Sequence, residues 1–204
     1  MSNSSEKPVF EMVKLGLILA VYAAISCTVL AVVNNFTSPK IAKNQEEKIN
    51  RAMQAFFPET GFTFESVTDF PASSNGTIKI ENLIVSKKDG KIQGGAAQVS
   101  GPTYDQGTIL VGIDSDGVVK GLQFLKLTDS PGFGLKANDS TFTLPNGKTF
   151  YGQFEGKNAM DGFIAGETFD AISGATITSK GVANLLNEGT SSLLKYFSEV
   201  KDEQ

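Results

Sequence analysis

The chain has 204 residues, a formal net charge of -4 at neutral pH, one cysteine, and neither histidine nor tryptophan. This acidic balance argues against nucleic acid as a partner, since a phosphate-binding surface is usually basic. One cysteine without histidine also excludes iron–sulfur clusters, c-type haem, Cys/His zinc sites and hydrolases with a histidine base. If this protein transfers electrons, an organic cofactor must carry them.

An uncharged apolar run extends from Leu15 to Val33. As a helix it would be about 28 Å long, close to the hydrocarbon core of a bilayer. We therefore predict a short tail over residues 1–14 and a transmembrane anchor over 15–35. The alternative is a cleaved signal peptide, but its apolar region usually spans only about 7–15 residues. Cys27 falls inside the run, where we expect a free thiol buried in the membrane.

The charges on either side of this run do not orient it. Two lysines precede it, and three lysines and an arginine follow it by residue 51. Because the more basic flank normally stays inside, counting charges does not favour an inside N-terminus.

The segment Ile41–Phe57 has apolar residues at helical spacing, and Pro58 marks its end. It predicts a helical connector over residues 36–58, leading into one domain over 59–204. Residues 59–76 are polar and favour turns.

Extended patterns dominate the next part of the chain. Strands are predicted over 77–85, 92–99, 108–113 and 118–127, with turns at Lys88–Gly90 and Asp114–Gly117. Asp114-Ser-Asp-Gly117 also resembles the start of a calcium-binding loop, but its glycine comes too early for an EF-hand, so a plain turn is favoured.

A last helix is predicted over Ser179–Phe197, with an apolar stripe, a weak point at Gly189, and Thr178 or Ser179 as its N-cap. Strands between helical ends give an α+β fold class: a single N-terminal transmembrane helix, then one strand-rich domain with a C-terminal helix.

The sequence Asp-Ala-Ile-Ser-Gly-Ala-Thr occupies residues 170–176, between a strand-like segment and this last helix. Thr176 offers a hydroxyl, and the small side chains of Gly174 and Ala175 let a bulky group approach the backbone. A helix starting near Thr178 would offer N–H groups to a phosphate. The alternative is an ordinary capped loop leading into a core helix.

The pattern D-x-x-S-G-A-T resembles the flavinylation signature of the FMN-binding domain family at Asp170, Ser173, Gly174, Ala175 and Thr176. The resemblance implies covalent FMN, joined to Thr176 by a phosphate ester. Thr178 is a rival hydroxyl, and Asp170 either presents Thr176 or caps a turn. A threonine hydroxyl is a poor nucleophile without a base, so the resemblance implies a separate flavin transferase, assisted by Mg²⁺.

A second segment resembles the family's E-T-P-G-aliphatic-G loop, which lies near the flavin. It comprises Asp129, Ser130, Pro131, Gly132, Phe133 and Gly134, with Asp, Ser and Phe replacing the usual Glu, Thr and aliphatic residue. The alternative is a Pro-Gly turn after a strand. Tyr104, in a nearby Gly/Pro loop, is either a flavin-stacking residue or a surface aromatic, and Lys126 and Lys136 are candidates for favouring anionic flavin.

The resemblance is strongest to the G subunits of Rnf electron transport complexes, and next to the C subunits of sodium-translocating NADH:quinone reductases. It implies an electron-carrying subunit in the cytoplasmic membrane, with its main domain outside and the other components of a membrane complex as partners. The alternatives are a self-standing FMN reductase and a non-redox anchored binding or assembly module.

Overall fold

The computed structural model describes residues 6–70, 73 and 76–202, which fall into two units, 1–47 and 48–204. Each unit is considered by itself. The helices and strands are α1 (Glu6–Phe56), β1 (Thr63–Val67), β2 (Lys79–Lys88), β3 (Lys91–Pro102), β4 (Gln106–Asp114), β5 (Val119–Leu127) and α2 (Thr176–Asp202), with short 3₁₀ turns η1 (Gly134–Asn138), η2 (Gly152–Phe154) and η3 (Ala159–Asp161).

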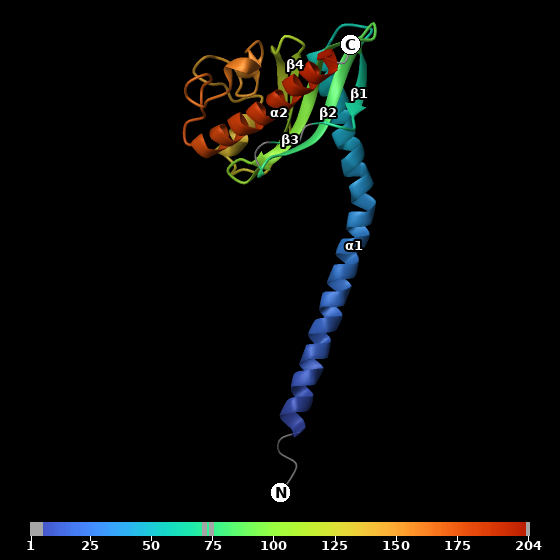
Figure 1. Ribbon diagram of the computed structural model, residues 1–204. Helices are drawn as coiled ribbons and strands as arrows, with labels where there is room; N and C mark the ends of the chain where they lie inside the picture. The colour runs from blue at the N-terminus through green and yellow to red at the C-terminus, as the bar shows by residue number, and fades with distance from the viewer. Residues whose placement is uncertain (1–5, 71–72, 74–75, 203–204) are drawn as a thin grey trace. The chain divides into compact units, whose positions relative to one another are not determined.

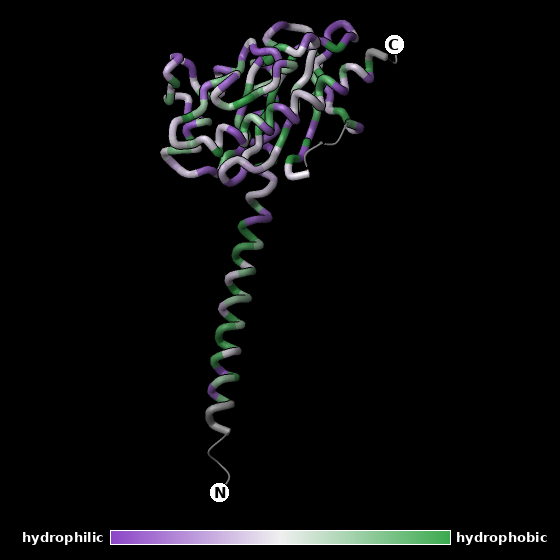
Figure 2. The backbone as a smooth tube through the Cα atoms, turned by 60° about the vertical axis from the view of Figure 1, so that its left-hand side comes forward, coloured by the Kyte–Doolittle hydropathy of each residue, from purple (hydrophilic) through white to green (hydrophobic). Residues whose placement is uncertain are grey.

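The anchor and the connector, expected as separate parts, belong to one continuous helix. α1 runs through both and tolerates Pro39 inside it, although proline removes one helical hydrogen bond. By length and composition α1 can cross a membrane. Figure 2 shows how hydrophobic residues gather along it, and Cys27 is a free thiol on its exposed surface.

The five strands form an antiparallel sheet whose spatial order equals their order in the sequence. Both predicted turns are confirmed. Asp89 and Gly90 have positive φ angles of 53° and 76° between β2 and β3, as a tight two-residue hairpin requires. In the second turn, a side-chain oxygen of Asp114 accepts the N–H groups of Asp116 and Val118.

Strand β1 lies in the stretch expected to be polar and turn-forming, so that expectation is wrong. Most of its residues stay exposed, which leaves little hydrophobic alternation to find in the sequence. Its pairing with β2 and the contact of the Phe64 ring with Phe57, 6.3 Å between centroids, hold it at the sheet edge.

Helix α2 covers one face of the sheet (Figure 1). Gly189, a weak point by helix propensity, allows this contact, because a Cβ there would lie 2.7 Å from Val99. The expected helix start needs correction. α2 begins at Thr176, so Thr178 and Ser179 lie within its first turn and are not N-caps.

The other face of the sheet is covered by the last turns of α1, within the second unit. Ala52, Met53, Phe56 and Phe57 are buried there against Leu110 and other sheet residues. Phe56 lies on two glycines that face each other across β4 and β5: a Cβ at Gly112 would be 2.5 Å from the ring, and a Cβ at Gly121 would collide with it. The sheet therefore has two apolar faces: the end of α1 covers one, and α2 together with the segment between β5 and α2 covers the other.

The irregular segment between β5 and α2 has a core of phenylalanines. Phe150, Phe154, Phe163 and Phe169 are buried and meet mostly edge to face at centroid distances of 4.8–5.9 Å. No strand leads directly into α2 in the described residues, contrary to expectation. The phenylalanine core instead supports the loop that delivers residues 170–175 to α2.

Candidate functional site

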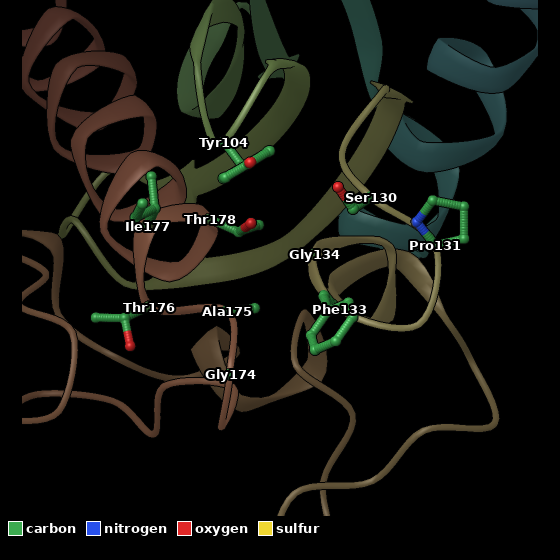
Figure 3. A pocket seen from close by; sticks show the side chains of 10 residues that line it. All are labelled: Tyr104, Ser130, Pro131, Phe133, Gly134, Gly174, Ala175, Thr176, Ile177 and Thr178. Atoms are coloured by element: carbon green, nitrogen blue, oxygen red, sulfur yellow. The ribbon is translucent and has the colours of Figure 1, made fainter.

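A cavity of about 530 Å³ opens where three segments meet at the start of α2. Its lining comprises Tyr104 from the β3–β4 turn, four residues of the loop after β5 (Ser130, Pro131, Phe133 and Gly134) and residues 174–178 (Figure 3). Tyr104, Phe133 and Ile177 are all more than half exposed. The lining therefore combines large apolar side chains with few polar groups, and its glycines let a ligand come close to the backbone.

The N-terminus of α2 forms one wall of the cavity. Gly174 adopts a positive φ of 78°, and the N–H of Ala175 bonds to the carbonyl of Ile172, so the chain turns sharply into the helix. Ala175 precedes the first helical residue, and its methyl group cannot cap the N–H groups that lack a helical partner. These donors and the positive end of the helix dipole favour an anion at this point.

Thr176 and Thr178 differ completely in accessibility, although both line the cavity. The side chain of Thr176 is exposed. Thr178 is 1% exposed, and its hydroxyl donates a hydrogen bond of 2.5 Å to Asp129. Figure 3 shows the two side chains leaving the first turn of α2 in different directions. Of these two threonines, only Thr176 has a hydroxyl that is open to an incoming reagent.

Asp129 is buried beneath the cavity and is not one of its lining residues. Its carboxylate accepts hydrogen bonds from the hydroxyls of Thr103 (2.6 Å) and Thr178, and from the backbone N–H groups of Tyr104 (3.2 Å) and Asp105 (3.0 Å). Burial raises the pKa of Asp129, but these four hydrogen bonds outweigh burial and hold the pKa below its usual value. The group is thus a carboxylate at neutral pH.

Asp170 is held by Gln153 and Asn146. Its N–H donates to the amide oxygen of Gln153 (2.8 Å), its carbonyl accepts from the same amide (3.1 Å), and its carboxylate accepts from Asn146 (2.7 Å). Asp170 lines a separate hollow of about 230 Å³. Its contacts anchor the loop that leads to Thr176.

The structure brings together most of the candidate residues predicted from the two motifs. Gly174, Ala175, Thr176 and Thr178 share the cavity with Ser130, Pro131 and Gly134. The other four candidates, Asp129, Gly132, Asp170 and Ser173, do not line it.

Sequence reasoning also missed parts of the site. It did not identify Ile177 as a lining residue, and it treated Phe133 only as a departure from a pattern. The network around Asp129 joins residues up to 75 positions apart, from Thr103 to Thr178, and no local pattern indicates it. Neither Lys126 nor Lys136 lines the cavity; the Lys136 ammonium instead lies 5.2 Å from the ring centre of Phe142.

The cavity fits FMN by its chemistry. Its volume lies within the range of ligand pockets, roughly 300–1,000 Å³. Its apolar rim suits a flat ring system, and the uncapped helix N-terminus suits a phosphate. Residues 103–191 match the FMN-binding domain family, and residues 1–55 match the family of RnfG N-terminal regions. The chain is thus an FMN-binding-domain protein with an N-terminal membrane anchor.

Curated relatives narrow this class further. The chain is 32% identical over 192 residues to the G subunit of the Na(+)-translocating ferredoxin:NAD(+) oxidoreductase complex of Acetobacterium woodii, covering 85% of this chain and 87% of that one. It is also 32% identical over 189 residues to the G subunit of the ion-translocating oxidoreductase complex of Erwinia tasmaniensis, covering 87% of each. It belongs to the family of G subunits of Rnf-type ion-translocating oxidoreductase complexes. The resemblance inferred from the motifs is confirmed.

Proposed function

We propose that this chain passes electrons through FMN joined by a phosphate ester to Thr176, as the flavoprotein subunit of an Rnf-type ion-translocating complex. The observation that supports this most directly is an exposed Thr176 hydroxyl at the uncapped N-terminus of α2, on a cavity with an apolar rim. FMN, when bound, supplies reversible uptake and release of electrons. The other subunits of the complex are its electron-transfer partners.

In this proposal different parts of the cavity bind different parts of FMN. Backbone N–H groups at the start of α2 bind the phosphate, as helix N-termini do. Tyr104, Phe133 and Ile177 supply the apolar surface for the ring system, and Ser130 and Gly134 allow close approach of the flavin to the loop. Asp170 and Ser173 act from outside the cavity, by presenting the loop that carries Thr176.

Attachment to Thr176 requires a separate flavin transferase, because the chain itself supplies no base for the Thr176 hydroxyl. It has no histidine, and among the described residues no carboxylate or lysine lines the cavity. The donor must carry a leaving group on phosphorus, as a flavin dinucleotide does. The bond between the Thr176 oxygen and phosphorus then forms as the pyrophosphate bond breaks. A nucleoside monophosphate leaves, and the hydroxyl proton passes to a base of the transferase.

The intact chain is expected to carry one covalent FMN when it is produced together with a flavin transferase, and none when the transferase is absent. The mass of the denatured protein and the fluorescence of its band in a denaturing gel measure this. An equal adduct from a host without any transferase would mean that the protein modifies itself, contrary to the proposal. Unmodified protein despite an active transferase would contradict the linkage.

The proposed organisation is a tail over 1–14, an anchor over 15–35, a helical connector over 36–58 and an FMN-binding domain over 59–204. The domain lies on the outer side of the cytoplasmic membrane, which is where a secreted transferase and the outer parts of a complex would meet it. The family resemblance supports this sidedness; the charges flanking the anchor do not.

Protease added to sealed right-side-out membranes is expected to digest the domain after residue 35, while the same protease leaves a cytoplasmic marker protein intact. The N-terminus of the undigested protein is expected to precede Leu15, because the apolar run stays in place. A domain that resists the added protease would show that the orientation is the reverse of the proposed one. A mature N-terminus at or beyond Cys27 would replace the anchor by a cleaved leader.

A further inference from the structure

One carboxylate ties together the three segments that form the flavin cavity. Asp129 belongs to the loop after β5. Three of its four hydrogen-bond donors come from the β3–β4 turn (Thr103, Tyr104 and Asp105), and the fourth is Thr178 in the first turn of α2. None of these donors is charged. We call Asp129 and these four hydrogen bonds the Asp129 latch.

Two glycines make room for the close packing around the latch. A Cβ at Gly134 would lie 2.5 Å from the Thr178 hydroxyl and 2.6 Å from the Cβ of Asp129. A Cβ at Gly181, one turn into α2, would lie 2.5 Å from the Cα of Thr103. Glycine at both positions allows the loop, the turn and the helix to approach within reach of one short carboxylate.

The latch also fixes the rotation of α2 about its axis. Successive residues of an α-helix are about 100° apart, so Thr176 and Thr178 project in nearly opposite directions. Drawing Thr178 inward onto Asp129 therefore turns Thr176 outward, where its hydroxyl is exposed. Ser179 already ties this turn to Ile172 and Ala175 within the same segment, and the Thr178–Asp129 bond adds the tether to the loop after β5.

We propose that Asp129 is a positioning residue of the flavin site: its carboxylate sets the first turn of α2 against the β3–β4 turn and so places Thr176 for flavin attachment. This inference rests on the proposed linkage at Thr176. Asp129 does not touch the reacting hydroxyl and acts only through Thr178 and the turn that carries Tyr104.

Four single variants of the full-length protein in detergent separate this role from simple loss of charge. Asp129→Asn places an NH₂ group where two donors need an acceptor. Thr178→Val removes the link to α2, whereas Thr178→Ser keeps the hydroxyl. Asp105→Asn is the matched control, because it removes one negative charge from the same turn but keeps the backbone N–H that binds Asp129.

Amide hydrogen exchange of the flavin-free protein is the first measurement. In Asp129→Asn, the amide of Tyr104 or of Asp105, whichever faces the new NH₂ group, is expected to exchange about tenfold faster or more, since hydrogen bonds to charged groups are stronger than average. Thr178→Val should speed the exchange of the Ser179 amide in the same way, because that N–H bonds to the carbonyl of Ala175 and closes the first turn of α2. Amides at the centre of β3 and β4 should keep their protection, which shows that the domain remains folded.

The second measurement is the initial rate of flavin attachment by purified transferase and flavin dinucleotide, at a temperature where those central amides stay protected in every variant. We expect Asp129→Asn and Thr178→Val to be modified about tenfold more slowly or worse. Thr178→Ser and Asp105→Asn should stay within about twofold of the unaltered protein, because both keep the latch.

Unaltered exchange in Asp129→Asn, or modification as fast as in Asp105→Asn, would overturn the proposal. If Asp129→Asn does not fold, Thr178→Val against Thr178→Ser decides the same question: equal rates would overturn it, and a tenfold gap would support it. If the unaltered protein accepts no flavin at all, the proposed linkage fails, and the exchange rates alone then decide whether the latch holds the first turn of α2.

Discussion

Replacing Thr176 by valine is expected to abolish the covalent flavin while leaving the domain folded. Valine keeps the branched shape of threonine but lacks the hydroxyl on which the ester forms. The side chain is exposed and makes no hydrogen bond within the described residues, so its loss should change the free energy of unfolding by less than about 0.5 kcal/mol. Fluorescence of the denatured band and the thermal melting midpoint measure both parts of this expectation.

Thr176→Ser serves as the control, because it retains a hydroxyl and should accept some flavin at a reduced rate. A fluorescent band of normal intensity in Thr176→Val would place the flavin elsewhere. Thr178 would not be its natural replacement, because that side chain is buried and already bonded to Asp129.

The same valine variant tests whether the flavin is needed for the activity of the complex. It should assemble, since the anchor and the folded surface are unchanged, but it should lose ion-coupled electron transfer in membranes that contain normal amounts of the protein. Wild-type rates in such membranes would mean that the flavin of this chain is dispensable.

Adding a single methyl group at Gly121 is expected to destabilise the domain strongly. The new Cβ would collide with the ring of Phe56, which is buried between the end of α1 and the sheet. Overpacking of this kind typically costs about 1–3 kcal/mol, more than the roughly 0.5–1 kcal/mol by which alanine is otherwise better than glycine in a strand. The thermal melting midpoint of Gly121→Ala should therefore fall.

The matched control is Gly76→Ala, because a Cβ at Gly76 would meet no atom within 4 Å. Replacing the Phe56 ring by the smaller leucine side chain in a Gly121→Ala/Phe56→Leu double variant should recover part of the lost stability, since the two residues are in contact. If Gly121→Ala is as stable as Gly76→Ala, Phe56 has room to move, and the close contact between α1 and the sheet is not a constraint.

Local patterns in the sequence predicted those features that local chemistry determines. The two turns before β3 and β5 follow from Asp-Gly pairs, and the anchor follows from an uninterrupted apolar run. The position of Thr176 beside a helix follows from a motif in which every residue is close to the next. The fold class could be predicted from such local patterns, and the family and its FMN-binding domain could be predicted from the resemblance of the motifs.

Features that depend on distant residues were not predicted. β1 lacks a hydrophobic pattern because it lies at an edge, and its position depends on pairing with β2. The start of α2 was placed three residues late, because Ser179 accepts the N–H of Ile172 and donates to the carbonyl of Ala175 instead of capping the helix. The role of Asp129 arises from three segments that only the tertiary fold brings together.

The order in which the chain is synthesised also constrains its maturation. The sheet pairs only strands that are neighbours in the sequence, so it can assemble strand by strand from β1 onward as the chain arrives on the proposed outer side of the membrane. The cavity forms only after the sheet, because one of its walls is the first turn of α2, some 70 residues after Tyr104. A transferase that recognises the finished cavity would therefore act after translation, as a test of completed folding, and protein that failed to dock α2 would remain without its cofactor.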